Sequence, residues 1–230
     1  MSLSTPPPTP AAAAGVFHSR LPLAERYCHL LATAGVTRGL IGPREAPRLW
    51  ERHLVNCALL ADAIEAEATV CDIGSGAGLP GIVLAIARPD LHVTLVEPLL
   101  RRTTFLDEVV AELELEQVEV VRQRAEELHG TREFSVVTSR AVAPLDRLLT
   151  WSMPLVRQGG ALVAMKGSSV QDEIDAAAKQ LKKFGAGAVS VTEYSTDGFT
   201  PPTTVLRVEA TQPSQLRLVS PGSKAKKKRR

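Results

Sequence analysis

The hydrophobic positions divide the chain into a helical first part and a second part in which strands and helices alternate. Between residues 17 and 66, apolar side chains recur at the three- and four-residue spacing of a helix, as at Tyr27 and Leu31. A second run of this kind covers residues 49–64, after the break at Gly42-Pro43. Residues 17–66 are therefore predicted to form helices and no strand.

From residue 69 the pattern changes to short apolar runs separated by amphipathic stretches. It predicts strands at 69–73, 91–96, 118–121, 134–138 and 161–165, with helices at 80–87, 100–113, 145–156 and 169–184. The strand runs are nearly unbroken, as in parallel strands covered on both faces. Two later strands, 188–194 and 203–209, have no helix between them and should pair antiparallel. We predict an α/β fold with a doubly wound, mostly parallel seven-stranded sheet, an antiparallel edge strand and N-terminal helices in front.

Composition and charge predict that the two terminal segments of the chain are disordered, unlike the residues between them. Six of the 27 Lys and Arg residues lie in the last seven positions, which leaves 21 basic against 25 acidic residues elsewhere. Like charges in a run repel one another and keep the segment disordered, and basic tails of this kind commonly bind polyanions. We expect a disordered Pro/Ala-rich head at 1–16, a helical segment packed on the core at 17–66, an α/β domain at 67–210 and a disordered basic tail at 211–230.

Other classes of protein are disfavoured by what the sequence lacks. No apolar run approaches the roughly 18 residues that span a bilayer, so no membrane association is expected. The cysteines Cys28, Cys57 and Cys71 are odd in number and have no CxxC spacing. We therefore expect neither a disulfide framework nor a metal site, and we place the protein in the cytoplasm.

The most informative motif follows the first predicted strand. Gly74, Gly76 and Gly78 alternate before a helix that Pro80 opens. Glycines let the backbone approach a ligand closely, and the helix start offers free N–H groups to an anionic part of it. Glu97 ends the second strand, where a carboxylate can accept both hydroxyls of a ribose. A purine-nucleoside cofactor is the first hypothesis, and a purely structural loop is the alternative.

The spacing of the glycines distinguishes between cofactors. In the dinucleotide pattern G-x-G-x-x-G, the third glycine position would fall on Leu79 here. The form D-x-G-x-G-x-G, which starts at Asp72, suits S-adenosylmethionine better because no pyrophosphate has to be bound. The loop resembles that of the Rossmann-like (class I) methyltransferases. A dinucleotide-dependent oxidoreductase on a similar sheet stays an alternative.

A closer resemblance extends over about residues 20 to 208. Several sequence motifs resemble those of the bacterial 16S ribosomal RNA guanine-N7 methyltransferases, a family also called glucose-inhibited division protein B. These motifs are RLWERHLVNCALL, DIGSGAGLPGIVLAIARPD, VEPLLRRTTFL, RQRAEEL, SRAVAPLD and AMKG. The resemblance implies S-adenosyl-L-methionine as the cofactor. It also implies that 16S ribosomal RNA, the small subunit or an assembly intermediate is the partner.

The resemblance also implies roles for individual residues at the cofactor. Its cofactor positions fall on Gly74, Gly76, Leu79, Glu97, Ala125, Glu126 and Arg140. Ala125 and Glu126 would hold the adenine by backbone and side chain respectively. The residues alone leave another possibility open, in which Glu126 and Glu127 cap the turn that follows.

Further residues are candidates for holding the RNA and the target base. Arg140 and Lys166 end the fourth and fifth strands, the end at which open α/β sheets bind ligands, and either could donate to the guanine O6. The expected RNA contacts are Arg48, Arg52, His53 and Arg102. Each of these residues also has a purely structural alternative. The arginines could be solvated surface residues, Lys166 could extend from its strand end into solvent, and His53 could be packed in the core.

The expected reaction needs positioning more than acid–base chemistry. Guanine N7 has an in-plane lone pair and no proton, so it can attack a sulfonium methyl group without a general base. This fits the absence of any Cys/His or Ser/His/Asp constellation, and rate enhancement would come from holding the two reactants together. We expect a monomeric enzyme. A protein that keeps the fold and binds RNA without turnover is the remaining alternative.

Overall fold

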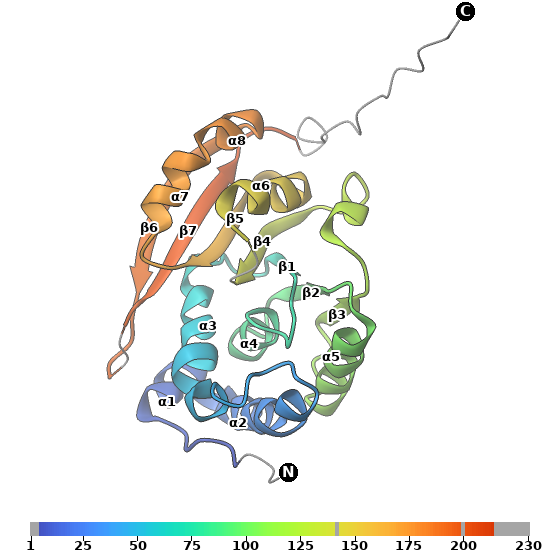
Figure 1. The fold of residues 1–230 in the computed structure, drawn as a ribbon, viewed down its shortest axis with the longest axis vertical. Helices are drawn as coiled ribbons and strands as arrows, with labels where there is room; N and C mark the ends of the chain where they lie inside the picture. Colours follow the sequence, from blue (N-terminus) through green and yellow to red (C-terminus); the bar gives the residue numbers. More distant parts are fainter. Residues whose placement is uncertain (1–4, 141–142, 199–200, 214–230) are drawn as a thin grey trace, which may run out of the picture.

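A computed structural model describes residues 5–140, 143–198 and 201–213. Seven strands form one sheet in the order β3-β2-β1-β4-β5-β7-β6 (Figure 1). The strands are β1 (Thr69–Ile73), β2 (His92–Val96), β3 (Val118–Val121), β4 (Phe134–Arg140), β5 (Val156–Lys166), β6 (Ala186–Tyr194) and β7 (Thr203–Ala210). The predicted doubly wound, mostly parallel sheet is confirmed.

The strand directions bring the ends of most strands to one edge of the sheet. Strands β1 to β5 pair in parallel, whereas β7 runs antiparallel to both β5 and β6. The predicted antiparallel pair is confirmed, with β6 at the edge and the reversed strand β7 second from it. The carboxyl ends of β1 to β6 and the start of β7 therefore share one edge, where ligands of open α/β sheets bind.

Eight α-helices surround the sheet in the described part of the chain. They are α1 (Ala11–Phe17), α2 (Leu21–Leu30), α3 (Asn56–Ala58), α4 (Gly81–Ala87), α5 (Leu100–Glu112), α6 (Leu145–Ser152), α7 (Val170–Ala176) and α8 (Ala178–Lys183). Short 3-10 or π turns are η1 (His18–Arg20), η2 (Leu31–Gly35), η3 (Ala46–Arg48), η4 (Trp50–Val55), η5 (Leu59–Ala63), η6 (Ala125–Leu128) and η7 (Met153–Leu155). The helix predicted at 169–184 is divided at Ala177, and the one predicted at 145–156 ends four residues early, before η7 and β5.

Each face of the sheet is covered by its own group of helices. One buried cluster joins the N-terminal helices, α4 and α5 to one face, and a second joins α6, α7 and α8 to the other (Figure 1). Consecutive strand residues alternate between them: Val70 belongs to the first cluster and Cys71 to the second. Both are fully buried, which explains why the strand sequences are mostly apolar on both faces.

The beginning of the chain differs from the prediction of disorder for residues 1–16. Residues from Ala11 onward form α1, and Ala13 is completely buried. Phe17 packs edge-on against Trp50 with the ring centroids 6.2 Å apart, and Trp50 Nε1 donates to the Pro7 carbonyl at 3.2 Å. The disorder prediction is therefore wrong for residues 11–16, which belong to a helix whose Ala13 and Phe17 are buried. Residues 214–230 of the predicted tail lie outside the described residues.

The three cysteines are free thiols in the interior. Cys28, Cys57 and Cys71 are each at most 1% exposed. Burial raises the pKa of Cys28 to about 12 and that of Cys57 to about 11. Because the thiolate is the reactive form, these side chains are chemically inert at neutral pH.

Candidate functional site

The loop after β1 needs its glycines for conformation and for space. Gly74, Gly76 and Gly78 have φ angles of 68°, 59° and 95°, in the left-handed region. A Cβ on Gly78 would lie 2.5 Å from Ile82 and 2.9 Å from the Tyr27 hydroxyl. The loop therefore presents backbone without side-chain bulk at the carboxyl end of β1.

Glu97 lies opposite this loop at the end of β2 and is held by several donors. Its side chain is only 2% exposed and accepts hydrogen bonds from the backbone N–H groups of Gly76 and Leu99 and from Arg102 Nη1, all at 3.1 Å. Each carboxylate oxygen can accept more than one hydrogen bond. The structure thus brings together two of the predicted cofactor residues, Gly76 and Glu97.

Asp72 is a buried carboxyl group directly beneath the loop, and the sequence prediction did not include it in the site. Its Oδ2 accepts from the Gly81 N–H at 3.0 Å, while Oδ1 has no hydrogen-bond partner among the described residues. Burial raises the pKa of Asp72 to about 7. Asp72 therefore changes its charge near neutral pH, next to the glycine loop.

Tyr27 connects the N-terminal helices to the same loop. It lies on α2, is completely buried, and donates its hydroxyl hydrogen to the Ala77 carbonyl at 2.6 Å. The helical periodicity marked Tyr27 only as a core residue. The structure shows that it also holds the loop, through the residue next to the one bonded by Glu97.

The predicted adenine contacts lie in η6, the turn that follows β3. Ala125 is half-buried and Glu126 is exposed. The neighbouring Glu127 accepts a hydrogen bond from the Arg124 N–H at 2.6 Å, so Glu127 caps the turn. Both adjacent acids are exposed, but only Glu127 caps the turn.

Arg140, at the end of β4, is joined to the N-terminal segment by a chain of polar groups. Its Nη1 lies 2.7 Å from His53 Nδ1, and His53 Nε2 lies 3.1 Å from Glu45 Oε2. A guanidinium group only donates, so Nδ1 accepts and the ring hydrogen is on Nε2, from which it is donated to Glu45. Burial, with help from the Arg140 charge, lowers the pKa of His53 to about 4.

This arrangement differs from the RNA contact expected of His53. The residue is 8% exposed, and both of its ring nitrogens are already engaged. Arg52 is the more accessible neighbour; it pairs with Glu45 at 2.9 Å while its side chain stays half exposed.

Lys166, at the end of β5, is fixed by an ion pair. Its Nζ lies 2.7 Å from Glu173 Oε2 and 3.4 Å from the Ala143 carbonyl. The same Glu173 oxygen accepts from the Leu145 N–H at 3.0 Å, in the first turn of α6. Lys166 is therefore held in place while one of its three ammonium hydrogens stays available.

Arg140 and Lys166 share a cleft of about 1100 Å³ between the sheet edge and the N-terminal segment. The described residues that line it are Arg52, His53, Asn56, Ser139, Arg140, Ala143, Pro144, Leu148, Met165, Lys166, Gly167, Ser168, Glu173, Glu193, Pro201, Pro202, Thr203 and Thr204. Thr203 closes one side by donating to Asn56 Oδ1 at 2.8 Å. The cleft is large enough for a nucleoside and carries both signs of charge.

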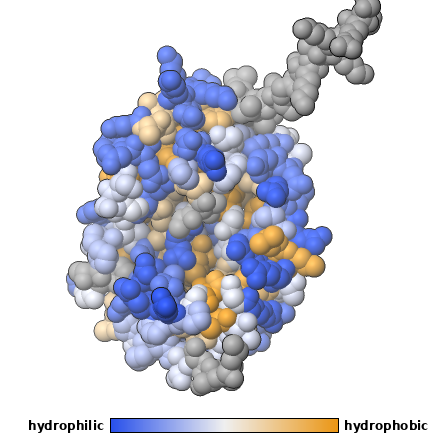
Figure 2. All heavy atoms as spheres, viewed as in Figure 1, coloured by the Kyte–Doolittle hydropathy of each residue, from blue (hydrophilic) through white to orange (hydrophobic). Residues whose placement is uncertain are grey.

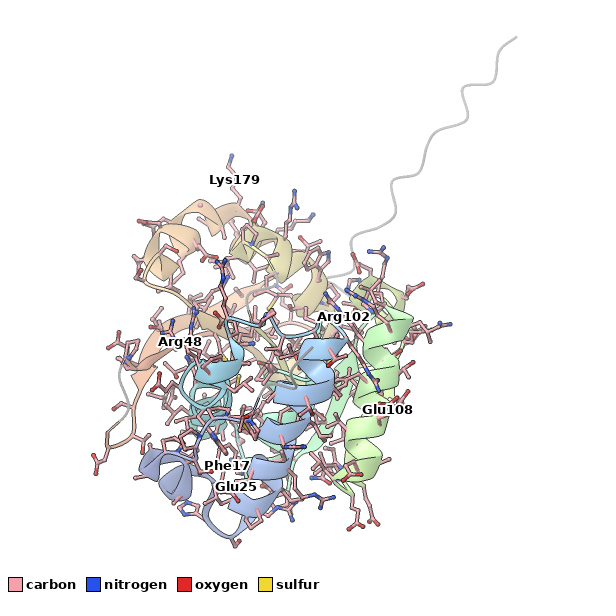
Figure 3. The ribbon with its side chains drawn as sticks, turned by 60° about the horizontal axis from the view of Figure 1, so that its bottom comes forward. Phe17, Glu25, Arg48, Arg102, Glu108 and Lys179 are labelled. Carbon is pink, nitrogen blue, oxygen red and sulfur yellow. The ribbon has the colours of Figure 1, made fainter. Side chains whose placement is uncertain are left out.

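The other predicted RNA contacts do not gather at one point. Figure 3 shows Arg102 at the start of α5, apart from Arg48 on the N-terminal segment. Arg48 is exposed, whereas Arg102 is bonded to Glu97. Leu99 and Leu100, beside Arg102, are 45% and 61% exposed, and Figure 2 shows apolar side chains surfacing amid a mostly hydrophilic face. The rim of the site therefore mixes arginines with apolar groups.

Comparison with known proteins identifies the family. Residues 20–198 match rRNA small subunit methyltransferase G, or GidB. The chain belongs to this family. The Ribosomal RNA small subunit methyltransferase G of Nocardioides sp. is 64% identical over 211 residues, which cover 91% of this chain and 84% of that protein. The protein of that name from Streptomyces coelicolor is 53% identical over 221 residues, covering 95% and 92%.

Solved structures with a similar fold include a complex with AdoMet and an O-methyltransferase family protein. M. jannaschii TYW2 in complex with AdoMet has a TM-score of 0.54 at 15% identity, covering 70% of this chain and 76% of that chain. An O-methyltransferase family protein from Burkholderia thailandensis also has a TM-score of 0.54, at 14% identity, covering 82% and 62%. At such identities, these structures support the Rossmann-like methyltransferase fold of the family.

Residues 5–140, 143–198 and 201–213 contain neither a candidate membrane span nor a candidate metal site. None of the helices there has the length and apolar character that crossing a membrane requires. The same residues contain no group of three or more His, Cys, Asp and Glu side chains placed to bind a metal ion.

Proposed function

We propose that this protein transfers a methyl group from S-adenosyl-L-methionine to N7 of a guanine in 16S ribosomal RNA. The observation that supports this proposal is that the glycine loop and Glu97 follow β1 and β2 at the same sheet edge as the cleft lined by Arg140 and Lys166. The relatives that match most of this chain are named for the ribosomal RNA of the small subunit. The small-subunit RNA of bacteria is the 16S molecule.

The residues present suit the cofactor. Glu97 offers a carboxylate to the ribose, and the backbone from Gly74 to Leu79 leaves room for the methionine part. Ala125 and the exposed Glu126 follow β3 at the same edge, where they would hold the adenine. Asp72 places an unpartnered oxygen under the loop. When bound, S-adenosylmethionine supplies an electrophilic methyl group on sulfonium sulfur.

The cleft residues then have to hold and orient the guanine. Its N7 lone pair carries no proton, so none of them has to act as a base. Arg140 and Lys166 are fixed by His53 and Glu173 respectively, and both can donate hydrogen bonds to a base. Holding two reactants in line and excluding water between them can contribute several kcal/mol to catalysis, up to about 10.

The RNA would be held mainly by charge. Arg52 lines the cleft, whereas Arg48 lies on η3 and Arg102 at the start of α5; all three would contact phosphates, while His53 acts through Arg140. One chain supplies both the sheet edge and the N-terminal wall, which supports a monomer. A ribosomal substrate places the reaction in the bacterial cytoplasm, on the free RNA, the small subunit or an assembly intermediate.

Methyl transfer to undermethylated small subunits tests the proposal directly. With labelled S-adenosylmethionine, we expect label in 16S RNA and a new chain-cleavage site at a 7-methylguanine after borohydride and aniline treatment. S-adenosylhomocysteine should raise the melting temperature of the protein, while NAD(H) should not. Label at another ring position, or stabilisation by NAD(H) alone, would contradict it.

A further inference from the structure

Three polar side chains form a row across the strands that border the cleft. Lys166 of β5 is the register partner of Thr204 of β7, and Thr204 is the register partner of Glu193 of β6. Directly opposed residues on neighbouring strands point to the same face of a sheet. All three line the cleft described above. The sheet therefore carries a lysine, a hydroxyl and a carboxylate in sequence, on strands about 4.8 Å apart.

The three groups differ in how free they are. Lys166 is held by Glu173 and keeps an ammonium hydrogen for a ligand. Glu193 is exposed and has no hydrogen bond or ion pair to another described residue. Thr204 is half-buried between them. The row thus presents a donor at one end, an acceptor at the other, and a hydroxyl that can do either in the middle.

We propose that this row reads the Watson–Crick edge of the target guanine, with Glu193 as the residue that determines base specificity. Guanine presents an acceptor (O6) followed by two donors (N1–H and the 2-amino group). Lys166 donates to O6, the Thr204 hydroxyl accepts from N1–H, and Glu193 accepts from the 2-amino group. Adenine has an amino group in place of O6, which would face the Lys166 ammonium. This inference rests on the proposed function and adds the recognition of its substrate.

The orientation of the base follows from the strand order. With O6 at β5, the neighbouring N7 is turned away from β7 and β6, toward β4 and β1. Arg140 ends β4 and the glycine loop follows β1. The row therefore directs N7 to the side of the sheet where the methyl group would be held. The reverse orientation of the base, with O6 at β6, would turn N7 away from that side.

The test compares guanine with inosine, which lacks only the 2-amino group. Small subunits are reconstituted with RNA that carries either base at the position the wild-type protein methylates, and kcat/KM is measured for each. Wild-type protein should prefer guanine by about tenfold or more, the usual effect of one hydrogen bond to a charged group. Glu193→Ala should lower kcat/KM for guanine by a similar factor and leave guanine and inosine equal.

Two further variants make the result specific. Glu209→Ala removes an exposed carboxylate from β7, away from the cleft lining, and should keep the wild-type preference for guanine. Thr204→Val should slow both substrates equally, because both have N1–H. An unchanged ratio of guanine to inosine in Glu193→Ala would overturn the recognition row while leaving the methyltransferase proposal intact. Absence of N7 methylation by the wild-type protein would overturn both.

Discussion

Arg140 Nη1 lies 2.7 Å from His53 Nδ1, and this contact joins residues 87 positions apart in the chain. It ties the end of a central strand to the N-terminal segment. Glu45 receives the hydrogen on the other ring nitrogen, so the orientation of the imidazole is fixed from both sides. The N-terminal segment is in this way part of the site, since it determines where the Arg140 guanidinium lies.

Two substitutions at His53 separate its two contacts. The amide oxygen of His53→Asn can take the place of Nδ1 and still accept from Arg140, whereas His53→Gln reaches the position of Nε2 and contacts only Glu45. We expect His53→Asn to keep kcat within a few-fold of wild type and His53→Gln to lose about tenfold, because Arg140 Nη1 then keeps only its longer contact, 3.3 Å, to the Arg52 carbonyl. Steady-state kinetics measure both effects. Equal losses of kcat in the two variants, with equal melting temperatures, would show that the hydrogen bond between His53 and Arg140 does not contribute to catalysis.

The Tyr27 hydroxyl should matter for binding of the cofactor. Tyr27→Phe keeps the packing and removes the donor to the Ala77 carbonyl, so that a buried acceptor is left without its partner. We expect a loss of about 1–2 kcal/mol in the free energy of unfolding and weaker binding of S-adenosylhomocysteine by calorimetry. Tyr194→Phe, half-buried on β6, is the matched control. If both variants bind like wild type, Tyr27 serves only the core.

Gly78 should tolerate no side chain. In Gly78→Ala the Cβ would meet Ile82 and Tyr27 at a φ of 95°. Overpacking and strain together predict a loss of about 2–4 kcal/mol in unfolding free energy. Gly39→Ala has a φ of 68° but nothing within 4 Å of the new Cβ, so it should cost about 1 kcal/mol. Chemical denaturation compares them, and equal losses would show that the loop has room for the methyl group.

Asp72 should make the fold less stable as the pH rises. Its pKa is about 7 in the folded protein and 3.8 for an unperturbed aspartate, so the folded state holds this proton more tightly than the unfolded state. Its contribution is complete below pH 4 and is lost as the pH rises through 7, by up to about 4 kcal/mol. Asp72→Asn, which needs no proton, should flatten this decline in denaturation curves taken between pH 5 and 8.

Asp90 supplies a control of opposite sign for that experiment. The Arg88 guanidinium beside it lowers the pKa of Asp90, so its contribution to stability is lost as the pH falls, below the range measured. Asp90→Asn should therefore leave the slope between pH 5 and 8 unchanged. A slope that survives in Asp72→Asn would assign the pH dependence to another group.

The sequence predicted those parts of the structure that depend on local pattern. The strand at 69–73, the glycine loop and the position of Glu97 at a strand end all follow from residues close together in the chain. The helix at 11–17 was missed because its alanines have little periodicity of their own. Only Ala13 among them is buried, and the aromatic contact of this helix joins Phe17 to Trp50, 33 residues later.

Contacts between distant segments could not be predicted in this way. His53 contacts either RNA or Arg140, depending on how the N-terminal segment packs on the sheet. No local sequence pattern determines that packing. The row of Lys166, Thr204 and Glu193 depends on the pairing register of β7 with its two neighbours. A shift of one residue would turn Glu193 to the other face of the sheet, so its place in the cleft is known only from the structure.

The inert thiols of Cys28, Cys57 and Cys71 make the protein convenient for spectroscopy. Maleimide reagents need an accessible thiolate, which none of the three provides in the folded state. A single new cysteine at the exposed Ser168, on the rim of the cleft, could therefore carry a fluorophore without removal of the native ones. Such a dye would report in real time when a nucleotide enters or leaves.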